Sequence, residues 1–183
     1  MKLCLDACVL FPTVMREVLL AVAGQGLFMP IWSDRILGEW QRAAARYGAQ
    51  AEGEALAAIA RAGDLFPKAR IPAQPGLEAR LYLPDDNDLH VLAVAIAGNA
   101  DAVVTLNAKD FPRGTLAVEG LERRDPDGLL WELWSHHPQA VETALESVRA
   151  TASRLSGEEK ALRPLLKRAK LTRLARAVAS DAG

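Results

Sequence analysis

The stretch DLHVLAVAIAGNADAVVT, residues 88–105, is the most regular part of the chain. Leu89 to Ala97 is almost wholly apolar and Gly98 follows it, which predicts a buried helix that stops at the glycine. The next apolar run, Ala102 to Thr105, is short and predicts a buried strand. A buried helix that leads directly into a buried strand is typical of an α/β fold.

Predicted strands and helices also alternate on the N-terminal side of this stretch. Two apolar runs, Lys2–Leu5 and Leu27–Trp32, predict strands. Helical spacing is found in three further segments: Thr13–Val22, residues 34–46 behind a cap at Ser33 or Asp34, and residues 49–62. The proline-containing segment Phe66–Leu83 predicts a connection with one short helical turn.

The sequence on the C-terminal side of this stretch has a different pattern. A turn around Lys109–Arg113 and a short strand near Leu116–Val118 are predicted first. Helical spacing then dominates three segments: Leu129–Trp134, Ala140–Leu155 and Gly157–Ala179, with Ser156 as a cap and Pro164 either near a first turn or at a kink. We therefore predict a three-layer α/β/α sandwich with a mainly parallel sheet in residues 1–125, and a helical C-terminal extension with a basic last helix in residues 126–183.

Composition indicates an ordinary globular protein. The chain has 183 residues, of which 50% are hydrophobic and 25% are charged, so one main domain with a real core is expected. Its longest apolar stretch is far shorter than the roughly 18 to 20 residues that cross a bilayer. Asp6 stands where a signal peptide would continue apolar, so we expect a cytoplasmic protein. Cys4 and Cys8 match no redox or zinc spacing and are interpreted as structural thiols.

The charge is unevenly distributed along the chain. Its formal net charge is -1, but residues 151–183 carry eight Lys or Arg and three Asp or Glu, so this tail is +5 and the rest is -6. Five basic residues are candidates for contact with RNA phosphates or a protein partner: Lys167, Arg168, Lys170, Arg173 and Arg176. The alternative is an amphipathic helix whose apolar side packs and whose positive side is solvated.

Acidic side chains stand where the predicted elements end or begin. Asp6 ends the first strand, and Asp110, with Asn107, follows the strand that ends at Thr105. Because ligands bind outside the carboxyl ends of parallel strands, these side chains are candidates for one site. Asp88 precedes the buried helix, and Asp85 and Asp86 crowd the same turn, where like charges repel unless solvent or a cation screens them.

Each acidic residue also has a simpler interpretation. Asp6 and Asp88 are common types of turn or cap residue, and Glu39 is a helix carboxylate at the border of an apolar face. Together, however, these residues supply the oxygen ligands that Mg²⁺ and Mn²⁺ prefer. The pattern therefore predicts a divalent metal site.

The order and spacing of these motifs resemble those of PIN domains, and most closely those of bacterial VapC-type toxins. The resemblance covers roughly residues 1–120 and rests on Leu5-Asp6, on Glu39 in SDRILGE, on DLHVLAVA from Asp88, and on TLNAKDFP from Thr105. It implies that Asp6, Glu39, Asp88 and Asp110 form a catalytic quartet, with Asp6, Asp88 and Asp110 on the metal. It also implies RNA as substrate, an antitoxin protein as partner, and a possible homodimer.

One position departs from that pattern. Asn107 stands where many relatives carry an acid, which leaves open whether Asn107 or Asp110 faces the metal and whether a second metal binds. Thr105, Asn107 and Asp86 are expected beside the ligands, where they hold water or substrate.

Three other interpretations compete with a nuclease. A phosphatase or dehalogenase with Asp6 as nucleophile usually needs an acid two residues later, where this chain has Cys8. A nucleotide-binding protein is disfavoured because Gly24-Gln25-Gly26 lacks the third glycine of the dinucleotide motif. A non-catalytic PIN-like module that binds RNA or protein is the main alternative, and Asn107 is its best support.

Overall fold

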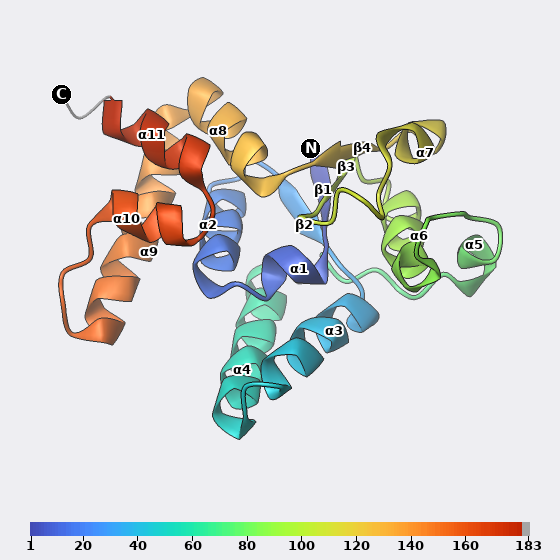
Figure 1. Ribbon diagram of the computed structural model, residues 1–183, viewed down its shortest axis with the longest axis horizontal. Helices are drawn as coiled ribbons and strands as arrows, with labels where there is room; N and C mark the ends of the chain where they lie inside the picture. Colours follow the sequence, from blue (N-terminus) through green and yellow to red (C-terminus); the bar gives the residue numbers. More distant parts are fainter. Residues whose placement is uncertain (181–183) are drawn as a thin grey trace. The chain divides into compact units, whose positions relative to one another are not determined.

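The computed structural model describes residues 1–180 and divides into two compact units (Figure 1). The first unit contains Met1–Phe11 and Phe28–Arg124, and the second contains Pro12–Leu27 and the chain from Asp125 onward. The predicted extension reaches Gly183, of which residues 181–183 lie outside the described part.

The first unit is built on a four-stranded parallel sheet with the order β2-β1-β3-β4. Its strands are β1 (Lys2–Leu5), β2 (Met29–Ile31), β3 (Ala102–Val104) and β4 (Glu122–Arg124). The two central strands are almost wholly buried, as expected of parallel strands that are covered on both faces. The chain moves from β1 to β2 on one side and later to β3 on the other, so the strand order reverses between β1 and β3.

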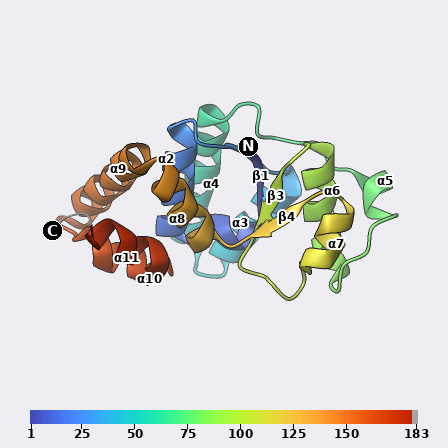
Figure 2. The same ribbon diagram turned by 90° about the horizontal axis from the view of Figure 1, so that it is seen from above.

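The remaining elements of this unit are helical. They are α1 (Ala7–Leu10), α3 (Asp34–Ala45), α4 (Ala49–Leu65), α5 (Pro75–Glu78), the 3-10 turn η1 (Asp86–Asp88), α6 (Leu89–Ala97) and α7 (Arg113–Val118). Ser33 caps α3 because its hydroxyl accepts a hydrogen bond from the Ile36 amide at 3.3 Å. The connections from β2 to β3 and from β3 to β4 both lead toward the β4 edge of the sheet. Because such crossovers between parallel strands are right-handed, α6 and α7 lie on the same face of the sheet (Figure 2).

Helix α6 spans the residues predicted for it. Five consecutive residues, Val91–Ala95, are buried, and the helix packs against β1 and β3. Gly98 ends it where the chain passes so close to β2 that a Cβ atom would overlap the Ile31 side chain. The predicted helix, its glycine stop and the strand after it are all confirmed.

The predicted strand at Leu116–Val118 is wrong. Those residues belong to α7, which begins after Pro112, and Val118 is 84% exposed. The fourth strand, β4, lies instead at Glu122–Arg124. As the edge strand it pairs only with β3, and its Glu-Arg-Arg sequence lacks the apolar pattern by which buried strands are predicted.

The second unit is helical. It contains α2 (Thr13–Gly24), α8 (Pro126–His136), α9 (Pro138–Ser156), α10 (Leu162–Arg168) and α11 (Thr172–Ser180). Helix α2 packs against α8 and α9, and α11 packs against α8 and α10. The Asp127 carboxylate fixes the start of α11 because it accepts hydrogen bonds from the Arg173 and Leu174 amides at 2.8 and 3.0 Å.

The single helix predicted for Gly157–Ala179 is also wrong. Two helices, α10 and α11, cover this range, and Lys170 between them has a φ of 61°. A non-glycine residue in that conformation ends a helix. Pro164 lies in the first turn of α10, and Ser156 is the last residue of α9 instead of a cap for the next helix.

Strands and helices therefore alternate around a parallel sheet, and helices follow at the C-terminal end. The predicted fold class, an α/β fold with a parallel sheet and C-terminal helices, is confirmed. Among residues 1–180, none of the helices combines the length and apolarity that a membrane crossing requires.

Candidate metal centre

Asp6 and Thr105 face each other at the carboxyl ends of the two central strands. Leu5 pairs with Val104 in the sheet, and the Asp6 amide donates to the Val104 carbonyl at 3.2 Å. The Thr105 hydroxyl then donates to Oδ2 of Asp6 at 2.7 Å. Asp6 is only 6% exposed, so this hydrogen bond fixes a buried carboxylate at the point where the strand order reverses.

Cys8 completes the surroundings of Asp6. Its Sγ donates to Oδ2 of Asp6 at 3.0 Å and accepts from the Leu106 amide at 3.2 Å. Burial and the negative charge of Asp6 raise the pKa of the Cys8 thiol to about 12. The thiol therefore stays protonated at neutral pH, where it acts as a donor to Asp6 instead of a soft metal ligand.

Asn107 joins two further carboxylates. Its Nδ2 donates to Oδ2 of Asp110 at 2.8 Å and to Oδ2 of Asp88 at 3.2 Å. The backbone amide of Asn107 also donates a hydrogen bond to the Thr105 hydroxyl at 2.9 Å, which links this group to Asp6. The loop after β3 therefore contacts both Asp6, which follows β1, and Asp88, which precedes α6.

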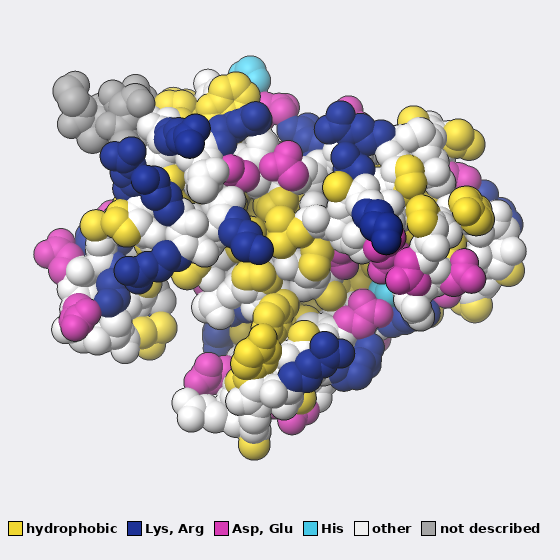
Figure 3. Space-filling model, viewed as in Figure 1, with side chains coloured by type: hydrophobic (Ala, Val, Ile, Leu, Met, Phe, Trp, Pro, Cys, Tyr) yellow, Lys and Arg dark blue, Asp and Glu magenta, His cyan; other side chains and the backbone are white. Residues whose placement is uncertain are grey.

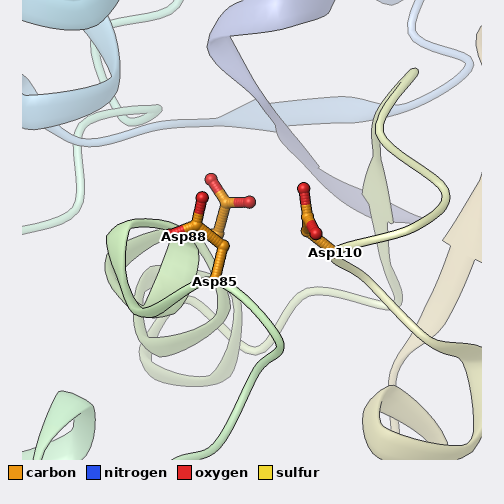
Figure 4. A group of neighbouring side chains, drawn as sticks. All are labelled: Asp85, Asp88 and Asp110. Carbon is orange, nitrogen blue, oxygen red and sulfur yellow. The ribbon is translucent and has the colours of Figure 1, made fainter.

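Asp85, which was not among the predicted site residues, belongs to the same group. One carboxylate oxygen from each of Asp85, Asp88 and Asp110 lies within 4.8 Å of the other two. Figure 4 shows Asp85 and Asp88 together in the turn before α6 and Asp110 opposite them, on the loop after β3.

The 3-10 geometry of η1 explains why Asp85 replaces Asp86 in this group. Asp85 caps the turn by accepting from the Asn87 amide at 2.9 Å. With about three residues per turn, side chains at i and i+3 share a face, which brings Asp85 beside Asp88. Asp86 is exposed and lies outside the group of converging carboxylates. The cap position of Asp85 was the sequence signal that could have identified it.

Negative charge accumulates at Asp88. Burial, followed by the charges of Asp6, Asp85 and Asp110, raises the pKa of Asp88 to about 6, and His90 opposes the increase. Asp6 therefore lies within electrostatic range of the Asp85, Asp88 and Asp110 cluster. A divalent cation relieves this repulsion, and carboxylate and amide oxygens are the ligands that Mg²⁺ and Mn²⁺ prefer.

Glu39 reaches the first turn of α6 from α3. Its Oε1 lies 2.9 Å from Nε2 of His90, a residue that is 2% exposed, and 3.6 Å from Nε of Arg35. Nη2 of Arg35 also donates to the Asn87 carbonyl at 3.2 Å. Glu39 is thus held beside the turn that carries Asp85 and Asp88, although it is not part of the converging carboxylate cluster.

The predicted basic residues belong to the second unit, whereas the acidic cluster belongs to the first. Lys167 and Arg168 end α10, Lys170 lies between the helices, and Arg173 and Arg176 lie on α11. All five are exposed, and Figure 3 shows Lys and Arg side chains gathered over α10 and α11. The guanidinium of Arg173 lies 5.2 Å from the centre of the Trp131 ring, which is a cation–π distance.

Comparison with known families agrees with this geometry. A family model described as a PIN domain matches residues 2–109, more than half of the chain, so the protein belongs to the PIN-domain family. The matched range includes Asp6, Glu39 and Asp88 and ends one residue before Asp110. No curated protein and no solved structure gave a significant match. PIN domains are generally metal-dependent nucleases.

Proposed function

We propose that this protein is an endoribonuclease that hydrolyses RNA phosphodiester bonds with Mg²⁺ or Mn²⁺. The observation that carries the proposal is the convergence of Asp85, Asp88 and Asp110 within 4.8 Å, beside Asp6 and at the carboxyl edge of a parallel sheet. If these residues had only a structural role, four carboxylates would repel one another at this edge of the sheet with no cation to offset the repulsion.

The residues of the candidate site have different proposed roles in this reaction. Asp6, Asp88 and Asp110 would hold the metal, and Asp85 adds a further carboxylate oxygen to the same space. A divalent ion held by these carboxylates would supply Lewis-acid chemistry, polarising a phosphate oxygen and lowering the pKa of water. Glu39 acts as the general base that orients the attacking water, because it lies outside the carboxylate cluster. Thr105 and Cys8 keep Asp6 in one orientation.

Asn107 supports a second candidate function, a PIN-like module that binds RNA or protein without cutting. The side-chain amide of Asn107 donates a hydrogen bond to one oxygen of Asp88 and to one oxygen of Asp110, so these two oxygens have a partner without any metal. In the nuclease, the same amide orients both carboxylates and leaves their second oxygens available. The two candidates differ in whether divalent metal makes the protein cut RNA.

The biological setting follows from the resemblance to VapC-type toxins. We infer a cytoplasmic toxin that is inhibited by an antitoxin protein and that forms a homodimer. The exposed basic residues of α10 and α11 are suited to bind RNA phosphates. Growth arrest on expression of the wild-type protein, and normal growth on expression of the Asp6→Asn variant, would support this role.

Cleavage of a labelled RNA by the full-length protein tests the proposed activity. We expect cleavage with Mg²⁺ or Mn²⁺, none with EDTA, and a loss of at least about 100-fold in Asp6→Asn, since even residues behind metal ligands cost 10–100-fold when changed. The matched control is Asp64→Asn, which removes an exposed carboxylate at the end of α4 and retains activity. Equal cleavage by Asp6→Asn, or no cleavage with any divalent metal, overturns the proposal.

A further inference from the structure

His90 is a buried polar side chain that the proposed chemistry does not use directly. It is the second residue of α6, and only 2% of its side chain is exposed. Within residues 1–180, neither of its ring nitrogens makes a hydrogen bond of good geometry. Burying an imidazole without partners costs free energy, so a purely apolar side chain would serve the core of the protein better.

The carboxylate of Glu39, a residue of the candidate site, lies close to the His90 ring. Nε2 of His90 lies 2.9 Å from Oε1 of Glu39, within hydrogen-bonding distance although the direction is poorly aligned. Because a carboxylate only accepts, Nε2 must carry the hydrogen in this contact. Contacts of this kind are often poorly aligned before substrate binds and tighten when it does.

This contact involves only one of the two oxygens of the Glu39 carboxylate. Nε of Arg35 approaches the same Oε1 at 3.6 Å, so both neighbours act on one oxygen and Oε2 is left for water. Glu39 is 30% exposed, and without a partner its flexible side chain turns freely toward solvent. The contact joins α3, which carries Glu39, to α6, which directly follows Asp88.

We propose that His90 is a positioning residue: its Nε2–H group holds Oε1 of Glu39, so that Oε2 of Glu39 faces the attacking water. The proposal rests on the nuclease activity inferred above, in which Glu39 is the general base. It requires only that Nε2 donates a hydrogen bond, which a neutral imidazole does.

A double-mutant cycle on the full-length protein tests this role. His90→Leu removes the donor, and His90→Gln restores one at about the same reach. Val91→Ala, a change at a neighbouring buried position of α6, is the control for loss of packing. The five variants to compare with the wild type are His90→Leu, His90→Gln, Val91→Ala, Glu39→Gln and the double variant Glu39→Gln with His90→Leu. Each is measured for kcat and KM in Mn²⁺-dependent RNA cleavage and for its melting temperature.

We expect His90→Leu to lower kcat by about 10- to 100-fold with KM nearly unchanged, the range found for residues that orient catalytic groups. His90→Gln should recover most of kcat, and His90→Leu should add less than about twofold to the loss in Glu39→Gln, because residues that act as a unit are not additive. Val91→Ala should lower the melting temperature without this change in kcat. Losses that multiply in the double variant, or failure of His90→Gln to recover kcat, overturn the proposal.

A readout without activity separates this proposal from the proposed nuclease. In the ¹⁵N NMR spectrum of the imidazole, the Nε2 proton of His90 should be protected from exchange in the wild type and lose that protection in Glu39→Ala. If the wild type cuts no RNA but this signal behaves as expected, the nuclease proposal fails and the contact stands. If the wild type cuts RNA and Glu39→Ala leaves the signal unchanged, the positioning role of His90 is wrong.

Discussion

The acidic edge of the sheet and the basic surface of α10 and α11 are both charged, but they are built differently. At the acidic edge, Asp6 is buried and receives hydrogen bonds from Thr105 and Cys8, and Asn107 holds Asp88 and Asp110. The five basic residues from Lys167 to Arg176 are exposed, and they lie on two helices with packed apolar sides and in the link between these helices. Fixed charges are suited to chemistry on one ion, whereas solvated charges are suited to attract a polyanion of variable shape.

Metal binding should distinguish the two regions most strongly. Mn²⁺ at 100 times its dissociation constant should raise the free energy of unfolding by about 2.7 kcal/mol. The double variant Asp88→Asn with Asp110→Asn should lose this effect, because two of the three converging carboxylates are gone. Thermal unfolding with and without Mn²⁺ measures the difference.

The matched variant for that experiment neutralises the basic surface. Lys167→Ala with Arg168→Ala should keep the full Mn²⁺ shift, because both residues lie outside the unit that holds the acidic cluster. A persistent shift in the Asp88 and Asp110 variant would mean that the ion binds elsewhere.

Charge reversal on the basic surface should act on substrate binding instead of on the chemical step. Lys167→Glu, Lys170→Glu and Arg176→Glu combined should raise KM for RNA by about tenfold at low salt and reduce the salt dependence of binding by a slope of about 2, since each phosphate contact on a single strand contributes about 0.7. Cleavage measured from 50 to 300 mM salt checks both effects. A drop in kcat with constant KM would place these residues in a catalytic role instead.

The raised pKa of Asp88 predicts a pH dependence of stability in the metal-free protein. Its pKa is about 6 in the folded chain, above its ordinary value of 3.8, so the folded state binds the proton more tightly than the unfolded state. This contribution to stability is complete below about pH 4 and is lost as the pH rises through 6. Asp88→Asn should therefore be more stable than the wild type at pH 7.5, by about 1 kcal/mol after allowance for solvent screening of this half-buried group.

Denaturant unfolding at pH 4.5 and 7.5, in EDTA, measures the Asp88 effect. The variant and the wild type should converge at the lower pH. The same comparison for Asp64→Asn should show no such divergence, because Asp64 lies exposed on α4. If the free energy of unfolding changed equally with pH in Asp88→Asn and in the wild type, the electrostatic account of the cluster would be contradicted.

The smallest expected effect concerns the backbone between α10 and α11. Lys170 has a φ of 61°, which glycine adopts without the steric cost that other residues incur. Lys170→Gly should raise the free energy of unfolding by about 0.5 kcal/mol, the difference between the relieved strain and the greater freedom of glycine in the unfolded chain. Lys167→Gly, in the last turn of α10, should lower it instead, because glycine has a lower helix propensity than lysine.

Elements with one dominant signal were predictable from sequence. Helix α6 is apolar except for His90 and is followed by a glycine, and β1 is a short buried run followed by Asp6, so both were located within a residue. The edge strand β4 carries Glu122, Arg123 and Arg124 and has no such signal. Its position depends on pairing with β3, which local sequence does not encode.

The site was predictable to a similar extent. Asp6, Asp88, Asn107 and Asp110 were identified because each one follows or precedes a well-predicted element, and the structure brings these residues together. Asp85 was missed because only the 3-10 form of η1 turns its side chain toward Asp88. The contact between Glu39 and His90 depends on how α3 and α6 are arranged in space, which periodicity does not reveal.

The hydrogen bond between Thr105 and Asp6 joins residues that are 99 positions apart. During synthesis, a chain that has been made only as far as Gly98 already contains Asp6, Glu39 and Asp88 but lacks the strand that must insert beside β1. The centre therefore assembles only after β3 and the loop behind it have been made, because a product that ends at Gly98 lacks Thr105, Asn107 and Asp110.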